Sequence, residues 1–309
     1  MTWSTDNIPA LTGKTVLVTG ANSGLGYESS RALARSGAHV IMACRNPAKA
    51  EAAASAIRSE SPEASLELIA LDLMSLHSVQ QAAERVLQSQ PRLDVLLNNA
   101  GVMAMPYQRT LDGFESQFGT NHLGHFALTA RLFPLLARTA GARVVNVSSI
   151  MHRLGWMRFD DLAWERGYDK WLAYGMSKLS NLLFTYELAR RCAQRHVDVT
   201  VACAHPGYSS TNLELRPSET EGNKLKRALV SIYNPLIAQP AARGALPQLY
   251  AATAPDVQSG DFYGPRVLQL WGAPKKVRSN ARSREQTSWQ RLWEVSDELT
   301  GVHFEAQLH

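Results

Sequence analysis

A tyrosine and a lysine stand four residues apart in a stretch with the composition of a long helix. Tyr174 and Lys178 fall within residues 171–195, where apolar residues recur three and four apart. On a helix this spacing places both side chains on one face. A nearby ammonium favours the phenolate form of a tyrosine, whose ordinary pKa is about 10, and so suits it to proton transfer. Because a tyrosine that merely packs on a lysine stem has the same spacing, the pair indicates acid–base chemistry only together with other motifs.

Glycines follow the first expected strand. The segment 20–26 reads GANSGLG and lies between an apolar run and a helical pattern. Glycines at such a junction let the backbone turn tightly and approach a diphosphate, which the free N–H groups of the helix start attract. The spacing is GxxxGxG rather than the GxGxxG fingerprint, and a tight turn alone would also explain it. Its place at the first strand–helix junction favours a dinucleotide site.

The end of the second expected strand indicates which dinucleotide would bind. An acidic residue there would bind the adenosine ribose diol and repel a 2′-phosphate. The chain has Cys44 and Arg45 instead, and the fork of an arginine suits a phosphate. We therefore predict a preference for NADP(H), with NAD(H) as the alternative cofactor and a merely solvated Arg45 as the alternative interpretation.

Short apolar runs alternate with helical patterns through the first two-thirds of the chain. This alternation predicts an α/β fold of the Rossmann type, a doubly wound parallel sheet with helices on both faces. No stretch rich in Gly, Ser or Pro divides the 309 residues, so we expect a single domain. Strands are expected at 15–19, 39–43, 66–70, 95–97, 143–147 and 199–202. Helices are expected at 24–36, 48–59, 75–89, 113–136, 171–195 and 288–299.

Taken in order, these motifs resemble those of the short-chain dehydrogenase/reductase family, in its retinol-dehydrogenase-like branch. The motifs that carry the resemblance are the glycine segment 20–26, Asp72-Leu73, NNAG at 98–101, Asn121, Ser148-Ser149, the Tyr174 and Lys178 pair, Pro206-Gly207 and Thr211. The resemblance covers about residues 12–265 as the core, and the C-terminal extension, about 266–309, resembles the same branch. It implies an oxidoreductase that interconverts an alcohol and a ketone or aldehyde.

The resemblance also implies a role for each residue. Tyr174 would be the general acid/base, and Lys178 would lower its pKa and bind the nicotinamide ribose, while the cofactor supplies the hydride. Ser149 would hydrogen-bond the substrate oxygen, because its separation of 25 residues from Tyr174 is similar to that of this branch. Asn121 would help to hold a water that links Lys178 to solvent. The implied cofactor-binding residues are Gly20, Asn22, Ser23, Gly24, Leu25, Gly26, Arg45, Asp72, Leu73, Asn99, Ala100, Gly101, Tyr174, Lys178, Pro206, Gly207 and Thr211.

One departure from the family bears on the cofactor. NADP-dependent members often carry a basic residue just before the middle glycine, where this chain has Ser23. Arg45 is therefore the main argument for NADP(H).

Two connections are longer than the fold requires. Residues 151–170 are dense in aromatic side chains, and residues 208–239 lie where family members often place a substrate lid. Aromatic side chains that line a cleft suit a bulky apolar substrate, such as a retinoid, steroid or lipid. A local core under the first connection is an equal alternative. The second could instead form an amphipathic surface for a membrane or a partner.

Composition limits other functions. The chain is 45% hydrophobic and 19% charged, and its net charge of +5 is spread along the sequence, so we expect no nucleic-acid partner. Its three cysteines have no paired spacing, and no Cys/His set suggests a metal site, which fits a protein of the reducing cytoplasm. The sequence contains no run of about 18 apolar residues, so we expect no integral membrane segment.

Three further expectations concern assembly and alternative activities. Family members that resemble this chain often pair through the helices containing Asn121 and Tyr174, which implies a homodimer. A non-catalytic NADP(H)-sensing or scaffold protein is one alternative function. A C=C reductase of the protochlorophyllide reductase type is another. The presence of Asn121, Ser149, Tyr174 and Lys178 together favours catalysis.

Overall fold

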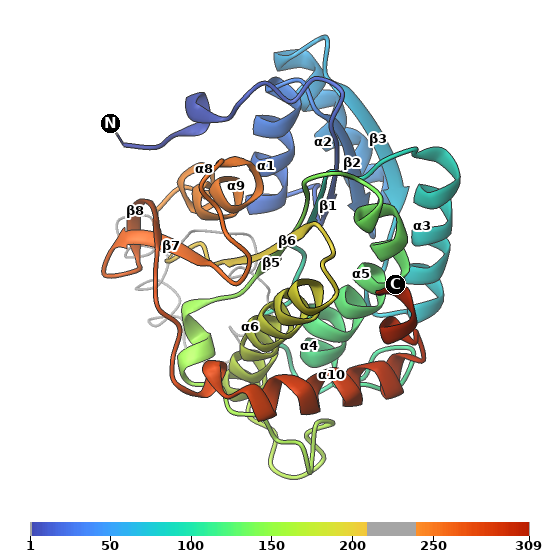
Figure 1. Cartoon of the computed structure of the whole chain (residues 1–309), viewed down its shortest axis with the longest axis vertical. Coiled ribbons are helices and arrows are strands. Elements are labelled where there is room, and N and C mark those ends of the chain that lie inside the picture. Colours follow the sequence, from blue (N-terminus) through green and yellow to red (C-terminus); the bar gives the residue numbers. More distant parts are fainter. Residues whose placement is uncertain (1, 209–238, 309) are drawn as a thin grey trace, which may run out of the picture.

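The structure, a computed structural model, describes residues 2–208 and 239–308. Within these ranges an eight-stranded sheet has the order β3-β2-β1-β4-β5-β6-β7-β8, parallel except for its last, antiparallel pair (Figure 1). The order reverses between β1 and β4, the switch point at which doubly wound sheets bind ligands. The strands are β1 (Thr15–Thr19), β2 (His39–Cys44), β3 (Ser65–Ala70), β4 (Val95–Asn98), β5 (Ala142–Val147), β6 (Val199–Ala204), β7 (Phe262–Val267) and β8 (Trp271–Lys276).

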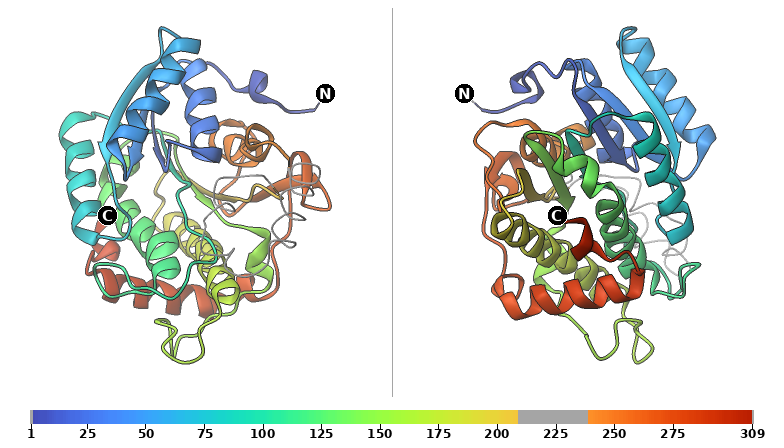
Figure 2. Two further views of the ribbon diagram at one scale, coloured as in Figure 1. Left: turned by 180° about the vertical axis from the view of Figure 1, so that it is seen from behind. Right: turned by 45° about the vertical axis from the view of Figure 1, so that its right-hand side comes forward.

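Helices cover both faces of the sheet, which confirms the predicted Rossmann-type α/β fold (Figures 1 and 2). Helices α1, α2 and α9 bury Leu33, Ile57 and Leu249 against one face. Helices α3, α5 and α6 cover the other face. The helices are α1 (Gly24–Arg35), α2 (Pro47–Glu60), α3 (Leu76–Ser89), α4 (Ser116–Phe118), α5 (Gly124–Ala137), α6 (Lys170–Gln194), α8 (Ala241–Gly244), α9 (Leu246–Thr253) and α10 (Gln286–Thr300). Short helical turns are η1 (Thr5–Asn7), η2 (Gly119–Leu123), η3 (Ile150–Arg153), η5 (Arg282–Arg284) and η6 (Phe304–Gln307).

Side-chain caps fix where the long helices begin. The Asp169 carboxylate accepts hydrogen bonds from the amides of Trp171 and Leu172, both at 2.9 Å, and so starts α6 at Lys170, four residues before Tyr174. Asn46 caps α2 in the same way, with Pro47 at the first helical position. The caps therefore set the helical phase on which the spacing of Tyr174 and Lys178 depends.

Two elements differ from the sequence-based expectations. The helix expected at 113–136 has three parts, because a π-helical turn, η2, separates α4 from α5. The sheet also continues beyond the expected six strands through β7 and β8. Prolines and glycines interrupt the strand pattern of β7 and β8. Such residues are tolerated in β8, which is the edge strand, and in the part of β7 beyond its pairing with β6.

The C-terminal segment packs across the helices on one face. Helix α10, expected at 288–299, ends at Gly301, whose φ of +60° suits a glycine cap. It crosses α6, and the chain then returns beside α5 (Figure 2). The rings of Trp293 and Phe304 stack at 4.7 Å and contact Phe126 and Phe184.

The aromatic connection at 151–170 forms mainly a local core. Trp164 is 2% exposed and packs with Phe159 and Tyr168 against α4, α6 and α10. Of the aromatic residues in this connection only Trp156 is exposed, as is Trp171 in the first turn of α6. Most of the aromatic side chains are therefore structural. The other long connection lies, apart from residues 208 and 239, outside the described residues.

Candidate active site

The tyrosine–lysine pair lies buried on α6, beside the carboxyl end of β5. Tyr174 and Lys178 are 5% and 4% exposed, and the Lys178 Nζ is 5.8 Å from the centre of the Tyr174 ring. The Nζ donates a hydrogen bond of 3.1 Å to the carbonyl of Val147, the last residue of β5. Burial lowers the pKa of Lys178 to about 8. The helix thus holds a titratable phenol and an easily deprotonated amine at the edge of the sheet where ligands bind in this fold.

The two serines after β5 have different environments. Ser148 is buried, and its hydroxyl donates a hydrogen bond of 2.7 Å to the carbonyl of Lys178. Ser149 is half-buried and caps η3, where its Oγ accepts a hydrogen bond from the amide of Met151. Ser148 therefore ties β5 to the catalytic helix, and Ser149 is the more accessible of the two.

Two glycines hold the segment after Ser149 against the helix of Tyr174. A Cβ atom at Gly155 would lie 2.3 Å from the carbonyl oxygen of Gly175. A Cβ atom at Gly175 would lie 2.9 Å from the carbonyl oxygen of Met151. Both neighbours are backbone atoms, so neither position has room for a side chain. This backbone contact sets the separation between the segment of Ser149 and that of Tyr174.

Asn121 lies within the π-helical turn η2 and joins three segments. Its side-chain amide accepts a hydrogen bond from the amide of Val102 and donates to the Val102 carbonyl and to the hydroxyl of Ser177. A Cβ atom at Gly101 would lie 3.1 Å from Asn121 Oδ1 and 3.3 Å from Lys178 Nζ. The structure thus brings Gly101, Asn121 and Lys178 into one cluster.

The glycine segment forms a close cradle at the start of α1. Gly20 has a φ of +67°, and a Cβ at Gly26 would lie 2.3 Å from the Gly20 carbonyl oxygen and 2.6 Å from Asn99 Nδ2. Ser23 precedes α1 and makes no side-chain cap, so its hydroxyl does not occupy the N–H groups at the start of the helix, which begins with Gly24, Leu25 and Gly26. Asn22 lies between these glycines and is half-buried. This backbone suits the diphosphate of a dinucleotide.

A buried polar network supports the cradle from behind, and motif spacing did not reveal it. The Thr19 hydroxyl accepts hydrogen bonds of 2.9 Å from the amides of Asn99 and Ala100. The Thr19 Oγ1 is also 2.9 Å from the Nε2 of His125. The Gln248 side chain, from α9, donates to Asn99 Oδ1 at 3.0 Å. Thr19 directly precedes the first glycine, but no pattern in the sequence points to His125 or Gln248.

The residues expected at the adenine end lie together after β2 and β3. Arg45 is exposed, and its Nη1 is 3.7 Å from the sulfur of Met74. The amide of Met74 donates to Asp72 Oδ1 at 3.0 Å. Leu73 is buried, and its carbonyl oxygen would be 2.7 Å from a Cβ at Gly124. The guanidinium of Arg45 is therefore free to reach a group that binds beyond the end of β2.

The last predicted motif lies at the end of β6. Gly207 has a φ of +70°, and a Cβ there would lie 2.4 Å from the carbonyl oxygen of Leu270, which connects β7 and β8. The carbonyl of Pro206 accepts a hydrogen bond from the side chain of Gln239. The β7–β8 hairpin thus holds this loop in place. Thr211 lies outside the described residues.

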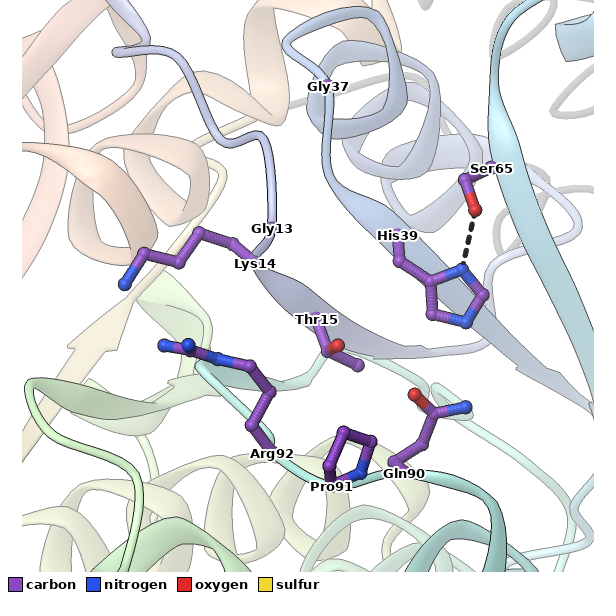
Figure 3. Close-up of a pocket in the computed structure, with 9 residues that line it drawn as sticks. All are labelled: Gly13, Lys14, Thr15, Gly37, His39, Ser65, Gln90, Pro91 and Arg92. Atoms are coloured by element: carbon purple, nitrogen blue, oxygen red, sulfur yellow. Dashed lines mark hydrogen bonds between the residues drawn. The ribbon is translucent and has the colours of Figure 1, made fainter.

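A surface hollow of about 510 Å³ lies at the opposite end of the sheet (Figure 3). Lys14 and Arg92 point into it, but both bind the carboxylate of Asp94, at 3.0 and 2.6 Å. Although burial opposes it, hydrogen bonds from Arg92, the Thr15 amide and Lys14 hold the pKa of Asp94 below its usual value. Both cations are bound to the same carboxylate, so this hollow has the character of a structural ion cluster.

The described residues contain neither a candidate membrane-spanning helix nor a candidate metal site. In residues 2–208 and 239–308, no helix is both long and apolar enough to cross a membrane. The same ranges contain no cluster of three or more His, Cys, Asp or Glu side chains suited to a metal ion.

Comparison with known proteins identifies the family. Residues 14–222 match the family model described as short chain dehydrogenase. Retinol dehydrogenase 12 of Mus musculus is 41% identical over 293 residues, which are 95% of this chain and 88% of that protein. Retinol dehydrogenase 14 of Homo sapiens is 41% identical, with coverage of 94% and 87%.

Solved structures agree. A protein from Mycobacterium paratuberculosis is 42% identical, with a TM-score of 0.80 over 97% of this chain and 98% of that one. A short-chain dehydrogenase from Shigella flexneri, solved in complex with NADP, is 27% identical with a TM-score of 0.64 over 83% of this chain and 98% of that one. The chain belongs to the short-chain dehydrogenase family. Within it, the chain is an NAD(P)-dependent oxidoreductase of the retinol-dehydrogenase-like branch and acts on CH–OH and C=O groups.

Proposed function

We propose that the protein uses NADP(H) to interconvert a bulky apolar alcohol with its ketone or aldehyde, and that Tyr174 carries the proton. The observation that carries this proposal is the buried pair of Tyr174 and Lys178 on α6. The Lys178 Nζ lies beside Gly101. The two residues before Gly101, Asn99 and Ala100, pack against the glycine cradle.

Each residue at the site has a role in the proposed reduction. The bound cofactor supplies the hydride. The Tyr174 hydroxyl gives its proton to the carbonyl oxygen, and the positive charge of Lys178 stabilises the phenolate that remains. The Ser149 hydroxyl donates a hydrogen bond to the same oxygen. Asn121 keeps Lys178 beside Gly101 and on a path along which a proton can return from solvent.

Different observations support the cofactor and the substrate. Arg45 stands exposed after β2, where a 2′-phosphate would bind, and the Shigella flexneri relative was solved with NADP. The substrate class rests on the relatives named retinol dehydrogenases, since most aromatic residues of 151–170 form a local core.

Three other sequence-based expectations remain predictions. These are a cytoplasmic location, a homodimer, and a core of about residues 12–265. The three cysteines are buried free thiols, which is in keeping with a reducing compartment.

The test is to replace Tyr174 by Phe and measure turnover and cofactor binding together. Tyr174→Phe should lose at least about a hundredfold in kcat on retinoid, steroid or aliphatic carbonyls, the range typical of a lost general acid, yet bind NADPH as the parent does. Tyr186→Phe is the matched control, because Tyr186 lies on the same helix and its hydroxyl is 2.8 Å from that of Ser279. Full activity in Tyr174→Phe would contradict the assigned mechanism.

The same titrations separate the alternatives. NADPH binding without turnover of any carbonyl or alcohol would favour a sensing or scaffold function. Turnover of C=C substrates alone would favour the second alternative. Arg45→Ala should weaken NADPH binding about tenfold, the effect of one charged hydrogen bond, and leave NADH binding unchanged. An unchanged affinity for NADPH would contradict the contact assigned to Arg45.

A further inference from the structure

The π-helical turn that carries Asn121 has a buried histidine at its far end. His125 is 2% exposed and stands at the second position of α5. Its Nδ1 lies 3.0 Å from the main-chain carbonyl oxygen of Asn121, and its Nε2 lies 2.9 Å from the hydroxyl of Thr19 at the end of β1. One ring thus spans the space between the catalytic turn and the strand that leads into the glycine cradle.

The acceptors around this ring determine its protonation. A carbonyl can only accept, so the Nδ1 of His125 must carry hydrogen. In a neutral ring the Nε2 then accepts, and the Thr19 hydroxyl is its donor, because the Nε2 at 2.9 Å is closer than the other acceptor of that hydroxyl, the carbonyl of Leu97 at 3.4 Å. The oxygen of that hydroxyl also accepts the amides of Asn99 and Ala100, both at 2.9 Å. Every polar atom of the network is satisfied with one arrangement of hydrogens, because burial lowers the pKa of His125 to about 4 and keeps the ring neutral.

We propose that His125 is a positioning residue that joins the catalytic turn to the cofactor cradle through Thr19. Its Nδ1–H donates to the carbonyl of Asn121 and thereby holds in place the turn that faces Lys178 and Gly101. Its Nε2 holds the Thr19 hydroxyl and so the two amides that shape the loop against Gly20 and Gly26. The inference rests on the proposed function, since His125 would position Asn121 for its role in that reaction.

Two amide substitutions separate the two halves of this link. Asparagine places its side-chain N–H where the Nδ1–H stands, so His125→Asn keeps the contact with Asn121 and loses that with Thr19. Glutamine reaches the position of Nε2, so His125→Gln keeps the contact with Thr19 and loses that with Asn121. His125→Leu loses both.

The expected result is a crossed pattern. His125→Asn should raise the dissociation constant of NADPH about fivefold and leave kcat within about twofold, which corresponds to one lost hydrogen bond at the cradle. His125→Gln should bind NADPH normally and lose about tenfold in kcat, because the Asn121 carbonyl loses its donor. Thr19→Val also removes the acceptor of the Asn99 and Ala100 amides, so it should weaken NADPH binding more than His125→Asn does, and adding His125→Asn to Thr19→Val should cause little further loss.

His122 provides the matched control in the same turn. It is also buried, but its Nε2 is 2.8 Å from the hydroxyl of Ser296 on α10, on the side away from the cradle. His122→Leu should lower the melting temperature as His125→Leu does, and leave the affinity for NADPH unchanged. Equal effects of the two leucine variants on cofactor affinity and kcat would overturn the proposal, as would equal effects of His125→Asn and His125→Gln.

A spectroscopic test needs no variant to be active. Ring ¹⁵N shifts of the histidine-labelled parent, with the His125 signal assigned from its loss in His125→Asn, should show the neutral Nδ1–H tautomer. An Nε2–H tautomer or a charged ring at neutral pH would overturn the proposal. If the parent binds nicotinamide dinucleotides but turns over no alcohol or carbonyl, the proposed function fails, whereas the tautomer and the NADPH affinities still decide the link.

Discussion

Replacing Gly175 by alanine tests whether a backbone contact sets the geometry of catalysis. The added Cβ would lie 2.9 Å from the carbonyl oxygen of Met151 and 3.1 Å from the nitrogen of Gly155. Ordinary contacts begin at 3.4 Å, so the segment that follows Ser149 must retreat by about 0.5 Å. A misplacement of about 1 Å at a reacting centre can cost about a hundredfold in rate. We therefore expect Gly175→Ala to lose about tenfold in kcat.

Stability should change much less. Overpacking costs about 1–3 kcal/mol, and alanine in place of glycine inside a helix returns up to about 1 kcal/mol. The free energy of unfolding should therefore fall by about 0–2 kcal/mol. Urea denaturation measures this change, and initial rates at saturating cofactor measure kcat and KM.

A control on the same helix separates geometry from stability. Leu188 is fully buried about 20 Å beyond Gly175 along α6, at about 1.5 Å per residue. Leu188→Ala should cost about 2–5 kcal/mol and leave kcat nearly unchanged. If folded Gly175→Ala keeps kcat within twofold of the parent, the Gly155–Gly175 contact does not set the position of Ser149, and the reasoning is refuted.

Three further predictions follow from the burial and contacts of polar groups. Ser149→Ala should lose at least about a hundredfold in kcat and about 1 kcal/mol in urea denaturation, because its Oγ also caps η3. Ser148→Ala should also cost about 1 kcal/mol, because the Ser148 hydroxyl donates to the backbone of α6, but lose far less kcat. Lys178 has a folded pKa of about 8 against an ordinary 10.5, so the unfolded chain binds more protons between these values. The free energy of unfolding of the cofactor-free protein should therefore rise with pH from about 8 to 10.5. At pH 7 Lys178→Met should be more stable than the parent, and its stability should lack this contribution to the rise. On acidification from pH 6.5 to about 4 the free energy of unfolding should fall instead. Burial lowers the pKa of four histidines, so the unfolded chain takes up protons that the folded chain does not. Replacing one of these histidines by Phe should lessen the slope of the unfolding free energy against pH, and an unchanged slope would count against the burial. These four are His122, His125, His152 and His205.

Local patterns were sufficient to predict the parallel strands and the spacing of the catalytic helix. The strands from β1 to β6 are short runs of Val, Ile and Leu because both faces of a parallel sheet are buried. Strands β7 and β8 escaped prediction because Pro265 and Pro274 interrupt the apolar pattern. The sheet tolerates them because β8 is the edge strand and Pro265 lies beyond the residues of β7 that pair with β6. The aromatic residues of 151–170 were ambiguous, since a cleft and a local core use the same side chains.

Contacts between distant residues could not be read from the sequence. Thr19 and His125 are 106 positions apart, and neither stands in a spacing that predicts their contact. The same holds for Gln248 and Asn99, which are 149 positions apart. Motif spacing indicates which side chains share a helix face or a loop. The network behind the cradle depends instead on how the ends of β1 and β4 pack beside α5 and α9.

The stacking of Trp293 on Phe304 has a consequence for the order in which the protein is made. Phe126 and Phe184 leave the ribosome first, and Phe304 follows 120 residues after Phe184. At about 5–20 residues per second, the two helices wait about 6–24 s for the rings that cover them. During that interval an apolar surface beside the catalytic turn is open to chaperones or to other nascent chains. The arrival of Trp293 and Phe304 then covers this surface.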